Sequence, residues 1–163
     1  MKIASIIAVI IAVIASASAV EVSENLLDAL HFVESCRGKY LKGNLNKKTG
    51  EYRAIGPFQL MKIYVDDVNI ILKNKGISKR YTYADRWSYQ KSKEMVIIYL
   101  KHYGRQFEID SERYITKSRP ELKGKIKVYC NDMVLSMIHN GGPKGYKKKE
   151  TQGYWRFVKR NLK

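Results

Sequence analysis

Hydrophobic positions recur at helical spacing along most of the chain. One such segment begins after Ser23, a good N-cap residue, and another runs from Pro57, a good first-turn residue, to near Gly76. Further segments of this kind run from Trp87 to Tyr103, from Ile126 to His139 and around residues 154–158. Residues 37–56 are rich in Gly, Asn and Lys and lack a helical stripe. We therefore expect a mainly α (α+β) fold, a single helical domain with a small loop or hairpin at residues 37–56.

The first residues follow a different pattern. Met1-Lys2 precedes an unbroken apolar run, Ile3–Ile14, which gives way to small residues ending at Ala19. This order is typical of a secretory signal peptide at residues 1–19, cleaved to leave a domain at residues 20–163. A retained membrane anchor is the alternative, because the apolar stretch is nearly long enough to span a bilayer. Cleavage predicts a secreted, extracellular protein without a stable membrane anchor, with a lysosomal or vacuolar destination as the alternative.

Export changes what the two cysteines predict. An oxidising compartment permits Cys36 and Cys130 to form a disulfide bond, and two buried free thiols are the alternative. Together with three scattered histidines they show no zinc-ligand spacing. We expect no metal site and no cofactor.

Positive charge dominates the composition. The chain has 31 Lys and Arg against 15 Asp and Glu, a net charge of +16, and residues 143–163 hold eight basic residues against one acid. Such a field attracts nucleic acid, anionic membranes or a bacterial wall. No nucleic-acid-binding motif is recognisable, which disfavours a specific nucleic-acid partner. A solvated basic face that only aids solubility remains the alternative.

Three segments contain candidate functional side chains. Glu34 ends an apolar helical stripe, where partial burial and the negative end of the helix dipole both favour a protonated carboxyl, as a general acid requires. Gln59 places an amide at the start of an apolar helix, where it can face a cleft. His139 and Asn140 precede two glycines whose backbone a ligand can approach. A solvated glutamate, a helix N-terminus and a helix C-cap are the respective alternatives.

Together these segments resemble a known family. Val33-Glu34-Ser35, Gly56-Pro57-Phe58-Gln59-Leu60 with Tyr64 and Asp67, Tyr99–Tyr103, Ile138-His139-Asn140-Gly141-Gly142-Pro143 and Tyr154-Trp155 occur in the order seen in invertebrate-type (destabilase-like) lysozymes. The resemblance covers residues 25 to 160, and the chain resembles a cysteine-poor member. Its Glu, G-x-x-Q and N-x-G features are also shared with lytic transglycosylases of the lysozyme superfamily.

The resemblance implies a lysozyme-like fold and a glycoside hydrolase, a muramidase that cleaves the β-1,4 bond between N-acetylmuramic acid and N-acetylglucosamine in peptidoglycan. Glu34 matches the catalytic acid of the family, and Gln59, His139 and Asn140 would line the saccharide cleft. Peptidoglycan would be the partner, and a monomer is the default. A lytic transglycosylase and a non-enzymatic cationic wall-binding or antimicrobial protein are the alternative functions.

The second carboxylate of the family has no counterpart at the matching position. Thr49 stands at the matching position, and the nearest acid is Glu51. Retaining glycosidases place two carboxyls about 5–5.5 Å apart, and inverting ones about 6.5–9.5 Å. Because Glu51 is the acid nearest to the matching position, it is the candidate nucleophile or base. The alternatives are that Glu34 acts alone, by substrate assistance or a transglycosylase route, or that the site is degenerate.

Overall fold

The computed structural model describes residues 20–163, and the signal peptide predicted at residues 1–19 lies outside them. The α-helices of this part are α1 (Glu24–Ser35), α2 (Lys62–Asn74), α3 (Tyr89–Ser118), α4 (Asp132–Gly141) and α5 (Glu150–Arg160). The 3₁₀ helices are η1 (Tyr83–Trp87), η2 (Pro120–Leu122) and η3 (Gly145–Lys147), and the strands are β1 (Ala54–Ile55) and β2 (Leu60–Met61). The predicted mainly helical fold with one small excursion is confirmed.

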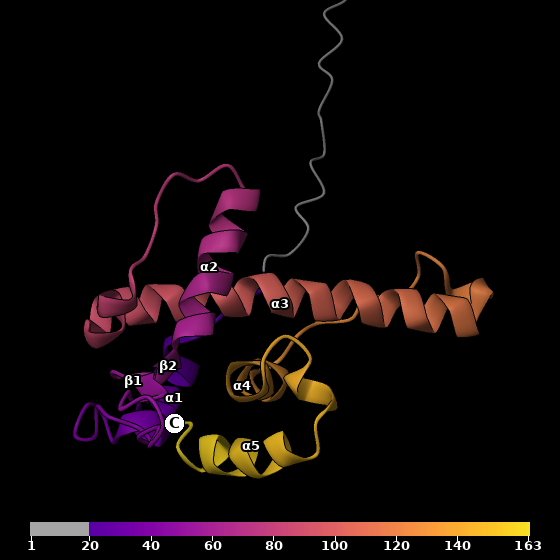
Figure 1. Ribbon diagram of the computed structural model, residues 1–163. Helices are drawn as coiled ribbons and strands as arrows, with labels where there is room; N and C mark the ends of the chain where they lie inside the picture. Colours follow the sequence, from indigo (N-terminus) through magenta and orange to yellow (C-terminus); the bar gives the residue numbers. More distant parts are fainter. Residues whose placement is uncertain (1–19) are drawn as a thin grey trace, which may run out of the picture.

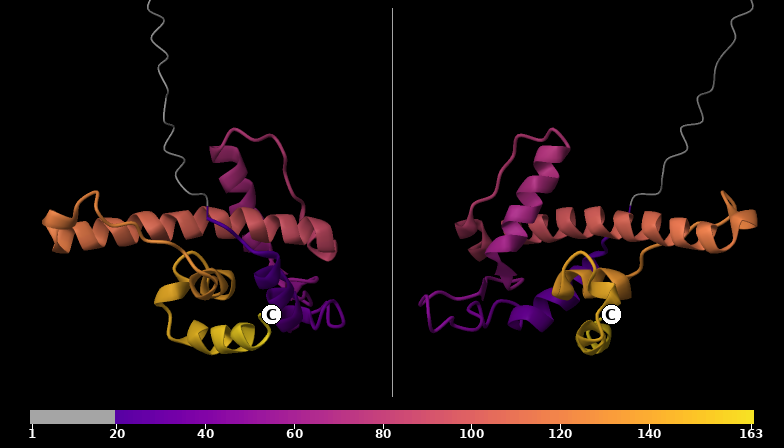
Figure 2. Two further views of the ribbon diagram at one scale, coloured as in Figure 1. Left: turned by 180° about the vertical axis from the view of Figure 1, so that it is seen from behind. Right: turned by 45° about the vertical axis from the view of Figure 1, so that its right-hand side comes forward.

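The long helix α3 organises the molecule. It crosses α2, while α1, the two strands, α4 and α5 all lie on one side of it (Figures 1 and 2). The C-terminus returns to α1, where the side-chain amide of Asn25 exchanges two hydrogen bonds with the backbone of Lys163, each 2.9 Å long. The end of the chain after α5 is therefore bonded to the first turn of α1.

A single core is shared by all five helices of the described part. Its fully buried members include Leu26, Leu30, Phe58, Val65, Val68, Met95, Val96, Leu100, Leu135, Ile138 and Val158. Burying such side chains is the main favourable contribution to folding. The core fixes the ends of α1 and α4, which provide the side chains described below.

The predicted start of α1 is confirmed, whereas that of α2 is wrong. The Ser23 hydroxyl accepts a hydrogen bond from the backbone N–H of Leu26 at 3.0 Å, as an N-cap residue does. The helix predicted from Pro57 begins only at Lys62. Gln59 has a left-handed backbone, with φ 46°, and the next two residues pair with β1. Both features are incompatible with a helix over residues 57–61.

The helix predicted from Ile126 begins at Asp132. The backbone N–H groups of Val128 and Cys130 instead donate to the side chains of Glu112 and Glu108 on α3, at 3.0 and 2.9 Å. These bonds hold the segment in a non-helical path along α3. Helix α3 continues to Ser118, beyond its predicted end at Tyr103, and Phe107 of this extension packs against the core.

The small excursion predicted at residues 37–56 is a short hairpin. Isolated bridges join Lys42 to Ile55 and Leu45 to Tyr52, and β1 pairs antiparallel with β2. The hairpin lies beside the C-terminal end of α1 (Figure 1). Across residues 20–163, no helix is both long enough and apolar enough to cross a membrane.

The predicted disulfide bond between Cys36 and Cys130 is wrong. Both cysteines are free, Cys36 being exposed and Cys130 half-buried. Cys36 is the C-cap of α1, next to the hairpin, whereas the Cys130 sulfur packs close to Gly104 of α3. Because the two thiols lie in different parts of the molecule, cross-linking by a disulfide does not contribute to the stability of this fold.

Candidate functional site

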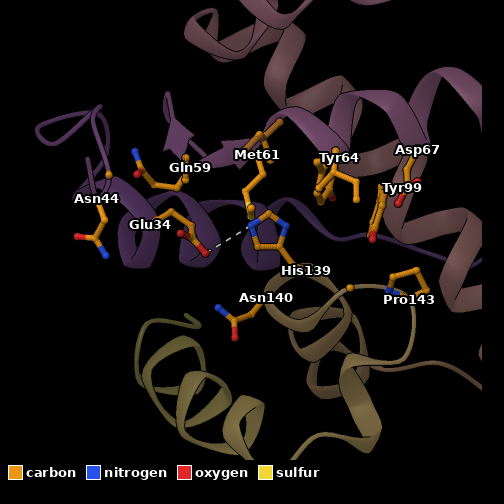
Figure 3. A pocket seen from close by; sticks show the side chains of 15 residues that line it. Glu34, Asn44, Gln59, Met61, Tyr64, Asp67, Tyr99, His139, Asn140 and Pro143 are labelled. Atoms are coloured by element: carbon orange, nitrogen blue, oxygen red, sulfur yellow. Dashed lines mark ion pairs between the residues drawn. The ribbon is translucent and has the colours of Figure 1, made fainter. Parts of the chain in front are cut away.

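A cavity of about 500 Å³ lies between the C-terminal end of α1, the hairpin, α2 and the C-terminal end of α4 (Figure 3). Its lining is Glu34, Gly43, Asn44, Ala54, Gln59, Leu60, Met61, Ile63, Tyr64, Asp67, Tyr99, His139, Asn140, Gly142 and Pro143. Four site residues predicted from the sequence, Glu34, Gln59, His139 and Asn140, are therefore brought together here. We call this cavity the Glu34 pocket.

Glu34 is held in place from two other helices. Its Oε1 accepts a hydrogen bond of 2.6 Å from the Tyr154 hydroxyl on α5, and His139 Nε2 of α4 lies 3.5 Å from the same oxygen (Figure 3). The glutamate side chain is 16% exposed, so it faces the pocket without being freely solvated. The carboxylate thus has a fixed position and can accept further hydrogen bonds from a ligand.

Ser35 joins Glu34 to the Gln59 segment. Its buried hydroxyl donates to the Pro57 carbonyl at 2.7 Å and accepts from the Gly38 backbone at 2.9 Å. The sequence assigned no role to this serine. The hydroxyl places the end of α1 against the turn that precedes β2, and so places Glu34 and Gln59 on the same pocket.

Gln59 is held by its own turn and by the hairpin. Its amide nitrogen donates to the Gly56 carbonyl at 2.9 Å and to the Tyr40 carbonyl at 3.3 Å. A Cβ at Gly43 would lie 2.9 Å from the Ala54 carbonyl oxygen, and one at Gly56 only 1.8 Å from the Arg86 carbonyl oxygen. Glycine is therefore required at both positions for the chain to approach so closely.

Two buried polar atoms of the pocket residues have no hydrogen-bond partner among the described residues. They are the Nδ1 of His139 and the hydroxyl of Tyr64, and both residues are 8% exposed. Burial raises the pKa of Tyr64 well above its usual value, with Tyr99, Glu34 and Asp67 adding to the effect. Unsatisfied buried polar groups are costly and uncommon, which makes them candidates for contact with a ligand or an ordered water.

The predicted second carboxylate lies elsewhere. The Glu51 side chain is 62% exposed, pairs with Lys62 Nζ at 2.7 Å and does not line the pocket. Lys62 lowers the pKa of this carboxyl. Glu51 and Glu34 therefore do not form a pair of carboxylates across the Glu34 pocket, and Thr49 contributes only a local hydroxyl contact to the Glu51 backbone.

The structure also adds residues to which the sequence assigned no role. Tyr154 lies 120 positions from its partner Glu34, and no local pattern predicts that contact. Asp67 and Tyr64 are three positions apart on α2, a spacing that puts both on one helix face and could have indicated Asp67. No group of three or more potential metal ligands occurs within the described residues.

Comparison with known proteins finds a similar fold and no matching family. No family model matches the chain, and no curated protein matches it. The chain is similar to a chain of the crystal structure of Aeromonas hydrophila PliI in complex with Meretrix lusoria lysozyme. The TM-score is 0.57 at 20% sequence identity, with 85% of this chain and 89% of that chain covered. A likeness at this identity shows the fold alone.

These findings correct the family and activity predicted from the sequence. No lysozyme family model matches the chain, and the similar structure, a complex of PliI with a lysozyme, shows a likeness of fold. On these findings the predicted invertebrate-type lysozyme, its muramidase or transglycosylase activity and the enzyme class are wrong.

Proposed function

We propose that this protein is a glycan-binding protein, and that the Glu34 pocket binds amino-sugar chains of the bacterial wall. The convergence of Glu34, Gln59, His139 and Asn140 on one cavity carries the proposal. Carbohydrate and other small-molecule sites combine a concave shape with a few fixed polar groups and aromatic or apolar walls. The Glu34 pocket has these features, because its polar side chains adjoin Tyr64 and Tyr99.

The charge outside the pocket supports a wall partner. The chain carries a net charge of +16, and eight basic residues lie in the segment 143–163. Bacterial walls are polyanionic, so long-range attraction would bring the protein to their surface while the pocket binds a glycan strand. The leader predicted at residues 1–19 supports a place of action outside the cell.

The test is calorimetric titration of the mature chain with a pentamer of N-acetylglucosamine. Glu34→Gln keeps the shape of the side chain and removes its charge. Since a hydrogen bond to a charged group contributes about 1.5–3 kcal/mol, we expect the Kd to rise about tenfold or more. Glu121→Gln is the matched control, because Glu121 lies on η2 outside the pocket lining, and its Kd should not change.

Mass spectrometry of the same mixtures gives an independent readout. The proposal expects the pentamer to be recovered intact. No binding at millimolar pentamer would contradict the proposal, as would equal affinity of Glu34→Gln and the unaltered chain. Shortened fragments that depend on Glu34 would contradict a role confined to binding.

A second candidate is binding to a lysozyme, and one observation favours it: the similar structure is a complex that contains a lysozyme. Met61 and Ile63, which line the Glu34 pocket, are 49% and 63% exposed and would suit a protein partner. Light scattering should then detect a complex with an invertebrate-type lysozyme, and wall lysis by that lysozyme should slow. Unchanged mass and unchanged lysis would exclude this candidate.

A further inference from the structure

The charge of the Glu34 pocket is opposite to that of the protein. Basic residues outnumber acidic ones by 31 to 15 in the whole chain. The pocket lining nevertheless holds two carboxylates, Glu34 and Asp67, and neither Lys nor Arg. Within a strongly basic molecule, the pocket is therefore a local site of negative charge, which favours a positively charged group over a neutral or anionic one.

The two carboxylates differ in their hydrogen-bond and ion-pair partners. Glu34 has the Tyr154 hydroxyl and His139 as neighbours. The half-buried carboxylate of Asp67, by contrast, makes no hydrogen bond and no ion pair within the part of the chain that the structure describes. The adjacent Asp66 does have a partner, since it accepts a hydrogen bond of 2.9 Å from the Tyr83 hydroxyl. Asp67 is thus the pocket acid with capacity left for a ligand.

Aromatic rings surround the Asp67 end of the pocket. Tyr64 stacks on Tyr99 with ring centroids 3.9 Å apart, and Tyr103 meets Tyr99 edge-on at 4.6 Å. Figure 3 shows Asp67 and Tyr99 side by side at the end of the pocket away from Glu34. Burial and the neighbouring Asp66 raise the pKa of Asp67. A carboxylate beside tyrosine rings is the environment in which proteins bind ammonium groups, through an ion pair and cation–π attraction.

We infer that the Asp67 end of the Glu34 pocket binds a primary ammonium group, so that the preferred glycan carries a free amine. The unpartnered Asp67, the buried Tyr64 hydroxyl without a partner and the lack of Lys and Arg in the lining support this assignment. The amine can come from a de-N-acetylated glucosamine unit or from a diamino acid of the attached wall peptide. The inference rests on the proposed binding of glycans in this pocket.

The test compares two pentamers that differ only in the amine, together with a muropeptide that carries its amine on the peptide. Calorimetric titrations at constant physiological salt use a glucosamine pentamer, an N-acetylglucosamine pentamer and an acetylated muropeptide with a free lysine. We expect the glucosamine pentamer to bind the unaltered chain about fivefold or more tightly than its acetylated counterpart. Asp67→Asn should abolish this preference, so that the two pentamers bind this variant with the same Kd.

Asp66→Asn is the matched control, because it removes the same charge one position away and outside the pocket lining. This variant should keep the preference for the amine, and thermal melts should show that both variants are folded. If only the muropeptide binds more tightly than the acetylated pentamer, and Asp67→Asn removes that difference in Kd, the result would support the ammonium site and assign the amine to the peptide. Equal binding of all three ligands, or a preference that survives Asp67→Asn, would overturn the inference and leave glycan binding intact. Failure of every ligand to bind would overturn both proposals.

Discussion

The Tyr154 hydroxyl donates a hydrogen bond of 2.6 Å to Glu34 Oε1, across 120 positions of sequence. Tyr154 is partly buried, and burial together with Glu34 raises its pKa well above the usual value. The phenol is therefore a hydrogen-bond donor at any ordinary pH. This contact joins α5 to α1 and fixes the carboxylate at one end of the pocket.

Replacing Tyr154 with Phe should weaken both folding and glycan binding. The variant keeps the ring and loses the hydroxyl, so the partly buried Glu34 carboxylate loses a donor. We expect the free energy of unfolding in urea to fall by about 1–2 kcal/mol and the Kd for the N-acetylglucosamine pentamer to rise several-fold. Tyr114→Phe is the control, since Tyr114 is 73% exposed and should tolerate the loss. Equal behaviour of the two variants would show that the hydroxyl does not position Glu34.

Local patterns were sufficient to predict part of the candidate site. Ser23 as an N-cap and the apolar stripe after it placed Glu34 at the end of α1. The glycines after Asn140 likewise placed that residue near the end of a helix, whereas Gln59, expected at the start of a helix, lies in the turn before β2. Their convergence on one pocket depends on the core, which brings the ends of α1 and α4 together.

Contacts between distant segments could not be predicted in this way. The start of α4 is set by Glu108 and Glu112, which bind backbone groups about 20 positions away, and a helical pattern over Ile126 contains no sign of them. The same holds for Cys36 and Cys130, because the spacing of two cysteines does not give their separation in space. The order of motifs suggested an activity as well, but similarity of fold does not establish function.

Gly56→Ala should be among the most damaging single substitutions. Gly56 has φ 84°, and a Cβ there would lie 1.8 Å from the backbone oxygen of Arg86, which has little freedom to move. We expect a loss of about 3 kcal/mol or more in the free energy of unfolding, and weaker glycan binding because Gln59 bonds to this turn. Gly153→Ala in α5 is the control. No atom lies within 4 Å of its added Cβ, so stability there should rise by about 0.5–1 kcal/mol.

The stability contributed by Asp28 should depend on pH. Arg37 and Lys163 hold the pKa of Asp28 well below its usual range, through contacts of 3.0 and 3.1 Å. Because the folded pKa is below the unfolded value of about 3.9, this contribution is present above about pH 4 and is lost as the pH falls towards 2. Asp28→Asn should therefore lower the Tm by about 2–4 °C at pH 7.

Melting curves of Asp28→Asn and the unaltered chain at several pH values test this dependence. The difference in Tm should shrink steadily between about pH 5 and pH 2. Glu121→Gln is the control, because Glu121 takes part in no ion pair within residues 20–163, and its Tm should equal that of the unaltered chain at every pH. A difference for Asp28→Asn that stays constant with pH would show that the ion pairs do not stabilise the fold.

The two free thiols should differ greatly in reactivity. Cys36 is exposed at the end of α1, whereas burial raises the pKa of Cys130 to about 12, so only about one in ten thousand Cys130 thiols is ionised at pH 8. With a thiol-specific chromogenic disulfide at pH 8, the native chain should release one equivalent rapidly and a second only in denaturant. Cys36→Ser should remove the rapid phase and leave the second. If no thiol reacts until a reductant is added, the cysteines are paired, and the absence of a disulfide in this fold would be refuted.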